Sequence, residues 1–209
     1  MKSPVIILGA GGHAKVVAEA LSLSGHKILG VVSPGEVKGT RCFGIEVLGN
    51  DDVIDSYSSK EILLANGVGS LPGENLRWEL AMKFRDKGYE FVNVIHPSAI
   101  IAKKVDFEEG VQIMAGSVIQ PNVHIGQDSI INTGSKVDHD SFVGKNCHLS
   151  PSVTLSGGVF INDGSHIGTG SIVIQNISIG SNCIIAAGSV IYKDICEGTT
   201  LIQQKKLLS

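Results

Sequence analysis

From residue 101 onward, apolar residues recur at every sixth position of the chain. The repeated positions are Ile101, Phe107, Ile113, Ile119, Ile125, Ile131, Val137, Val143, Leu149, Leu155, Ile161, Ile167, Val173, Ile179, Ile185 and Ile191. From Val111 on, the residue two places before each is small or β-branched, most often serine. Strands of an ordinary β-sandwich do not keep one spacing for about 90 residues, so the period indicates a hexapeptide β-helix.

Six residues provide one short strand and a corner, so three hexads close a triangular coil of 18 residues. Sixteen hexads then form about five coils, stacked at the roughly 4.8 Å spacing of hydrogen-bonded strands. Glycine follows the apolar position at Gly126, Gly144, Gly168 and Gly180, as expected for tight corners. We therefore predict a parallel β-helix over residues 96–209.

The first 95 residues have a different pattern, in which strand and helix signals alternate. Strands are expected at 5–8, 28–32, 61–65 and 89–94, and helices at 13–24 and 75–87. Residues 33–60 are expected to form a loop with one short helix near 51–56. The expected buried helix faces are Val16, Val17, Ala20 and Leu21, and Leu76, Leu80 and Phe84. This alternation predicts a small, parallel, Rossmann-like α/β domain over residues 1–95.

Composition excludes several classes of protein. The 209 residues carry a net charge of −3, without the basic surplus typical of nucleic-acid binding. No run approaches the roughly 20 apolar residues of a membrane span. The four cysteines show no CxxC spacing, so we expect a reduced, cytoplasmic protein.

The strongest candidate for chemistry is His139. It follows the inward Val137 by two residues and should point outward at a coil corner, flanked by Asp138 and Asp140. A carboxylate that accepts from one imidazole nitrogen fixes the tautomer and keeps the other nitrogen basic. This arrangement predicts a general base.

Four motifs together resemble one family. They are Gly9-Ala-Gly-Gly-His-Ala14, His96-Pro-Ser-Ala99, Asn132-Thr-Gly134 and Asp138-His-Asp140. In combination they are similar to the sialic acid O-acetyltransferases and UDP-4-amino-sugar N-acetyltransferases, the bacterial hexapeptide-repeat acyltransferases of the NeuD/PglD type. The resemblance implies a left-handed coil, acetyl-CoA as co-substrate, and a homotrimer with an active site at each subunit interface.

The resemblance also implies roles for residues of the repeat. His139 would be the general base and Asp140 its partner, with Asn132 near the substrate. The backbone N–H of Gly157 would stabilise the oxyanion. His148, expected to face outward in mid-face, would contact acetyl-CoA at an interface.

Other residues are candidates for binding phosphate groups. Lys193, together with Lys205 and Lys206, could meet the phosphates of coenzyme A. Gly9, Gly11 and Gly12 follow a strand and precede a helix, as in dinucleotide cradles. The resemblance assigns this loop, with His13 and a second glycine loop at Gly67, to the nucleotide of a nucleotide sugar.

Two segments depart from the family pattern. Val31-Val-Ser-Pro34 replaces an acidic pair that holds the nucleoside, which weakens the case for uridine and leaves room for a CMP-linked or free acidic sugar. Gly198-Thr-Thr-Leu-Ile-Gln203 replaces the usual Gly-x-Pro-Ala segment near the coenzyme.

The favoured function is acetyl-CoA-dependent acetylation of a nucleotide-linked amino sugar, of the UDP-4-amino-4,6-dideoxy-N-acetylhexosamine type, for bacterial surface glycans. O-acetylation of a sialic or other nonulosonic acid is the alternative, and the motifs leave the choice open. Two further classes are a zinc hydratase of the carbonic-anhydrase kind and a non-catalytic nucleotide-sugar-binding protein. His148 and His166 would stack on adjacent coils as half a zinc site, but zinc needs a third protein ligand. His124 and His139 fall on other faces, although a second chain could bring one in. We therefore expect no metal.

Overall fold

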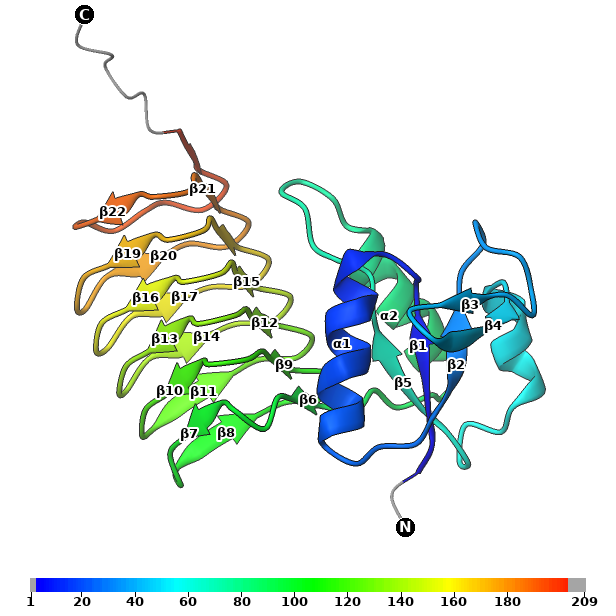
Figure 1. Ribbon diagram of the computed structural model, residues 1–209. Helices are drawn as coiled ribbons and strands as arrows, with labels where there is room; N and C mark the ends of the chain where they lie inside the picture. Colours follow the sequence, from blue (N-terminus) through cyan, green and yellow to red (C-terminus); the bar gives the residue numbers. More distant parts are fainter. Residues whose placement is uncertain (1–2, 203–209) are drawn as a thin grey trace, which may run out of the picture. The chain divides into compact units, whose positions relative to one another are not determined.

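The computed structural model describes residues 3–202, which form two compact units (Figure 1). The first unit contains the chain up to Pro97 together with Glu109–Met114. The second contains Ser98–Glu108 and the chain from Ala115 onward.

The first unit is built on a five-stranded sheet in the order β3-β4-β2-β1-β5. Its elements are β1 (Val5–Leu8), α1 (Gly12–Leu23), β2 (Ile28–Val32), β3 (Arg41–Cys42), β4 (Ile45–Gly49), the 3-10 helix η1 (Asp51–Ser56), β5 (Leu63–Asn66) and α2 (Leu76–Asp86). Successive side chains of a strand point to opposite faces. Val5 and Ile7 of β1 accordingly pack in one apolar cluster with α1, and Ile6 and Leu8 pack in another with α2. Both faces of the sheet are therefore covered.

Several predictions for this unit need correction. The expected loop contains β3 and β4, whose antiparallel pairing makes the sheet mixed. The two residues of β3 are too few to show a period, whereas β4 was missed although Ile45 and Val47 alternate with Glu46. The strand expected at 89–94 is reduced to a single bridge at Phe91 and to β6 (Val94–Ile95). On α2, Leu76 is 58% exposed and Arg77 is buried instead, because its guanidinium bonds backbone carbonyls of the loop after β5. Val16 of α1 is also exposed.

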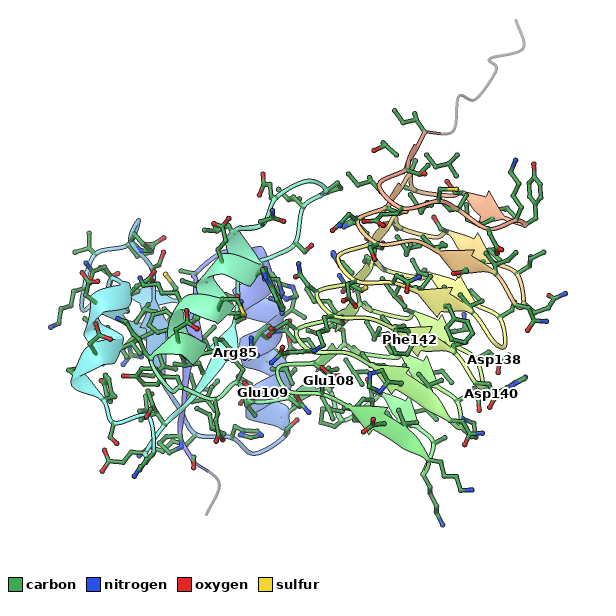
Figure 2. All side chains as sticks on the ribbon, turned by 180° about the vertical axis from the view of Figure 1, so that it is seen from behind. Arg85, Glu108, Glu109, Asp138, Asp140 and Phe142 are labelled. Atoms are coloured by element: carbon green, nitrogen blue, oxygen red, sulfur yellow. The ribbon has the colours of Figure 1, made fainter. Side chains whose placement is uncertain are left out.

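The segment Glu109–Met114 is anchored to the first unit by polar contacts. Its β9 (Gln112–Ile113) pairs in parallel with β6. Glu109 Oε1 accepts from Arg85 Nε at 3.1 Å and from the backbone N–H of Phe91 at 2.9 Å. Figure 2 shows Arg85 and Glu109 close to each other.

The second unit is a parallel β-helix with three sheets. The first sheet contains β7 (Ile100–Ile101), β10 (Val118–Ile119), β13 (Lys136–Val137), β16 (Thr154–Leu155), β19 (Ile172–Val173) and β22 (Val190–Ile191). The second contains β8 (Val105–Phe107), β11 (Val123–Ile125), β14 (Phe142–Val143), β17 (Phe160–Ile161) and β20 (Ser178–Ile179). The third contains β12 (Ile130–Ile131), β15 (His148–Leu149), β18 (His166–Ile167), β21 (Ile184–Ile185) and β23 (Thr200–Leu201).

Strand register confirms the 18-residue coil. Lys136 pairs with Val118 and with Thr154, and this spacing repeats along the coil. The last coil is two residues shorter, since Ile184 pairs with Thr200. Every predicted inward apolar position is buried except Ile101 and Phe107 of the first coil, which are half-buried.

Small inward residues keep the corners of the coil compact. The buried hydroxyl of Ser129 donates to the carbonyl of Gly144 at 2.6 Å, and that of Ser135 donates to the carbonyl of Ser150 at 2.9 Å. A buried hydroxyl without a partner would be costly, so these bonds allow serine in the core. At Gly126 a Cβ would lie 2.6 Å from the backbone of Gly144. That glycine therefore serves close coil stacking.

Candidate active site

The Asp138–Asp140 corner joins β13 to β14, between the first and second sheets of the β-helix. Figure 2 shows Asp138 and Asp140 at this turn. The imidazole of His139 is 61% exposed, and its Nδ1 lies 2.8 Å from Asp140 Oδ2. Asp138 Oδ1 accepts from the backbone N–H of His139 at 2.8 Å. The predicted outward histidine with its carboxylate neighbour is thus present, and Nε2 faces away from the bond to Asp140.

The electrostatics of this corner favour a basic imidazole. The hydrogen bond that the imidazole donates to Asp140, and next the charge of Asp138, raises the pKa of His139 above its ordinary value. Asn122 Nδ2 donates to Asp140 Oδ1 at 2.9 Å, and this bond, followed by the one to His139, lowers the pKa of Asp140. Sequence reasoning missed Asn122, although it lies 18 residues, or one coil, before Asp140.

Gly157 occupies the same corner one coil later. A Cβ on Gly157 would lie 2.7 Å from Cε1 and 2.8 Å from Nε2 of His139. The backbone N–H of the next residue, Gly158, donates to the carbonyl of His139 at 2.9 Å. The structure therefore brings His139, Asp140 and Gly157 together, and only glycine leaves room for the ring in this position.

A second cluster lies on the third sheet and contains the predicted Asn132 and His148. Asn132 Nδ2 is 3.1 Å from His148 Nε2. His148 faces outward as predicted, yet it is only 8% exposed. The ring of His166 on the next coil packs against it edge-on, with centroids 4.8 Å apart. Neighbours on its own sheet thus cover an outward-facing position.

The two stacked histidines do not extend to a metal site. His166 Nε2 is 3.1 Å from Ser150 Oγ, and burial lowers the pKa of His166. Across residues 3–202, no three His, Cys, Asp or Glu side chains are arranged to hold a metal ion. The donor set required by the zinc-hydratase hypothesis is therefore missing from the described chain.

The predicted nucleotide loop lies at the carboxyl end of β1. Gly9 has a φ of 93°, and Gly11 is the N-cap of α1 without a side-chain cap. A Cβ on Gly11 or Gly12 would meet no atom within 4 Å, so this backbone is open to a ligand. Gly67 follows β5, where a Cβ would lie 2.7 Å from both Ala14 Cβ and the carbonyl of Leu8. Gly67 is thus required by packing between the two loops.

His13 is held by a residue that the sequence did not reveal. Its Nε2 lies 2.7 Å from Oε1 of the buried Gln112. Burial, followed by the nearby guanidinium of Arg77, lowers the pKa of His13 to about 4. The imidazole is therefore neutral at pH 7.

Lys193 lies on the last coil of the β-helix. It borders a hollow of about 220 Å³ that Val190, Ile191, Tyr192, Ile195 and Leu201 also line. Lys205 and Lys206 lie outside the described residues.

Neither α1 nor α2 has the length and apolar character needed to cross a bilayer.

Comparison with known proteins identifies both parts of the chain. Residues 4–84 match the model of the PglD N-terminal domain, and residues 104–139 match the model of the bacterial transferase hexapeptide (six repeats).

Solved structures match nearly the whole chain. A histidine-to-asparagine variant of perosamine N-acetyltransferase from Caulobacter crescentus, in complex with CoA and GDP-perosamine, is 36% identical with a TM-score of 0.87, over 96% of this chain and 93% of that chain. The acetyltransferase domain of PglB from Neisseria gonorrhoeae, in complex with acetyl coenzyme A, is 30% identical with a TM-score of 0.87, over 96% of both chains. WeeI from Acinetobacter baumannii shares the fold at 22% identity and a TM-score of 0.84, over 97% of both chains.

These matches confirm the predicted α/β N-terminal domain followed by a left-handed parallel β-helix. They also confirm the expected class of enzyme, an acyltransferase. The chain belongs to the PglD/NeuD-like family of hexapeptide acyltransferases.

Proposed function

We propose that this enzyme transfers the acetyl group of acetyl-CoA to the amino group of a nucleotide-linked amino sugar, a precursor of bacterial surface glycans. The observation that carries the proposal is the exposed His139–Asp140 pair packed against Gly157. The 36% identical relative, which carries a histidine substitution, is complexed with CoA and GDP-perosamine, and this supports the same classes of substrate.

In this mechanism the sugar amine attacks the thioester carbonyl carbon. His139 Nε2 takes the proton that the nitrogen loses, and Asp140 stabilises the resulting imidazolium through Nδ1. The oxyanion of the tetrahedral intermediate accepts hydrogen bonds from backbone N–H groups, for which Gly157 is our candidate. The C–S bond then breaks, and the imidazolium returns the proton to the coenzyme A thiolate.

For the nucleotide sugar, we assign the domain of residues 1–95. Backbone N–H groups of Gly11, Gly12 and the first turn of α1 would receive the diphosphate, because no side chain caps this helix. Ser33 and Pro34 stand at the end of β2 in place of an acidic pair, and the 36% identical relative holds a GDP-sugar. Both UDP- and GDP-linked amino sugars are therefore candidate acceptors.

We assign the binding of acetyl-CoA to His148, Asn132, Gly157 and Lys193. These residues lie in the β-helix domain, residues 96–209, of a homotrimer. Within one chain His139 lies at a corner between the first and second sheets, whereas His148 lies on the third sheet. A thioester held by His148 would therefore meet His139 of a neighbouring copy.

The cysteines of the described chain are unpaired, in keeping with a cytoplasmic enzyme.

Thiol release from acetyl-CoA tests the proposal on a panel of UDP- and GDP-linked 4-amino sugars, CMP-sialic acids and free nonulosonic acids. Turnover with an amino sugar and mass-spectrometric detection of an N-acetyl product are expected. Turnover only with nonulosonic acids would replace the proposal with O-acetylation. Tight binding of a nucleotide sugar without any thiol release would instead indicate a binding protein.

A further inference from the structure

Gln112 of β9 is a buried polar residue. It is 1% exposed, and both ends of its amide are engaged within the first unit. Its Nε2 donates to the backbone carbonyl of Asn66 at 2.7 Å. Its Oε1 lies 2.7 Å from Nε2 of His13.

These two contacts determine the tautomer of His13. A backbone carbonyl can only accept, so the Gln112 amide must present its NH₂ group to Asn66 and its oxygen to His13. That oxygen is also only an acceptor, so Nε2 of His13 must carry the hydrogen. Nδ1 of the neutral ring then holds a free lone pair.

The lone pair of His13 is open to a ligand. Within residues 3–202, Nδ1 of His13 has no hydrogen-bond partner, and this atom is not buried. The ring stays uncharged because burial and Arg77 oppose its protonation. His13 can therefore accept a hydrogen bond at Nδ1, and it carries no charge to pair with a phosphate.

The surroundings of Asn66 make this arrangement rigid. Its side chain donates to the carbonyl of Arg77 at 2.9 Å and accepts from the backbone N–H of Val68 at 3.1 Å. The guanidinium of Arg77 in turn donates to the carbonyls of Asn66 and Val68 at 2.9 and 2.7 Å. Gln112 thus connects His13 to a loop whose backbone is held on both sides.

We propose that Gln112 is a positioning residue that presents His13 Nδ1 as an acceptor to a hydroxyl or amino group of the nucleotide sugar. A diphosphate at neutral pH has no proton to donate to this lone pair, so its contacts fall to the backbone N–H groups of the loop. This inference rests on the proposed function for the identity of the ligand, whereas the tautomer of His13 does not depend on it.

The test combines nitrogen NMR of the His13 ring with kinetics on Gln112→Met. In the unsubstituted protein at pH 7, Nε2 should give the shift of a protonated nitrogen and Nδ1 that of an unprotonated one. Gln112→Met keeps the side-chain length and removes the acceptor, so both tautomers should populate. We expect KM for the nucleotide sugar to rise about tenfold, the scale of one hydrogen bond, while KM for acetyl-CoA changes less than about twofold. Gln127→Met, at a half-buried corner of the β-helix, is the matched control and should change neither.

Substitution of His13 itself separates an acceptor from a cation. His13→Asn can offer an oxygen near the position of Nδ1 and should retain more affinity for the nucleotide sugar than His13→Lys, which can only donate. Better binding by His13→Lys would overturn the proposal, as would an imidazolium or an Nδ1–H ring in the NMR spectrum. A Gln112→Met protein that melts normally and mixes the tautomers, yet binds the sugar unchanged, would refute the positioning role. A wild-type chain inactive on every nucleotide sugar would refute the proposed function and the ligand role, while the NMR result would still decide the tautomer.

Discussion

The substitution Gly157→Ala tests how closely the corner is fitted to the imidazole of His139. Gly157 does not have a left-handed φ, so alanine is compatible with its backbone. The added methyl group retains the backbone N–H that we assign to the oxyanion. Within residues 3–202, the atoms nearest to it belong to the His139 ring, at 2.7 Å for Cε1 and 2.8 Å for Nε2.

The size of this conflict sets the expected loss of activity. Ordinary contacts begin near 3.4 Å, so the ring must retreat by at least about 0.7 Å. A displacement approaching 1 Å can cost about 10²-fold in rate when a catalytic group must be aligned. The ring is largely exposed and can swing aside, so the thermal midpoint should be nearly unchanged. We therefore expect kcat to fall between 10- and 100-fold, on the order of the cost of misalignment.

Thiol release from acetyl-CoA measures this loss, and thermal melting followed by circular dichroism checks the fold. The control is the same substitution in a His139→Ala background. Without the ring there is nothing to displace, so Gly157→Ala should change the residual rate by less than about twofold. An equal loss in both backgrounds would refute crowding of His139 as the cause.

Four further substitutions test the corner and the coil. His139→Ala should melt normally and lose about 10²-fold or more in acetyl transfer; near-normal turnover would remove His139 from the mechanism. Asp140→Asn should lower the pKa of His139, because the bond to Asp140 is the main cause of its raised value. Since the base is active only when unprotonated, the fall of kcat/KM on the acid side of the pH profile should move to lower pH; an unchanged profile would contradict this. Asn122→Gly keeps the positive φ of 61° but removes the donor to Asp140, and should lower kcat about fivefold, the scale of one hydrogen bond. Ile161→Asp would bury an unpaired charge at a fully buried position and should prevent the coil from folding. A circular dichroism spectrum typical of a folded protein would refute the core assignment.

The β-helix could be predicted in detail because its period determines nearly every contact. Once 18 residues make a coil, a residue lies over the residues 18 places before and after it. The inward row of apolar residues and the stacking of His148 on His166 both follow from this spacing. The same arithmetic connects Asn122 to Asp140 and His139 to Gly157.

The α/β part was harder to predict because its short elements do not belong to a repeat. The hairpin of β3 and β4 pairs Arg41 with Glu46, and its apolar alternation is confined to Ile45 and Val47 of β4. On α2, the spacing of Leu76 and Leu80 favoured an apolar face, but the buried Arg77 replaces Leu76 because it serves the backbone of the neighbouring loop. Hydropathy does not register a cation that is buried by its hydrogen bonds.

His148 and Gln112 show where the periodic argument ends. The period correctly places His148 on the outside of the coil, yet the amide of Asn132 and the ring of His166 reduce its exposure to 8%. Outward direction and solvent exposure are therefore different properties on a sheet with large polar side chains. Gln112 contacts His13, which is 99 residues away in the sequence and lies outside the hexapeptide repeat. The period of the coil therefore cannot predict this contact. The coil spacing predicts the groups that surround His139, whereas the groups that set the protonation of His13 follow only from tertiary structure.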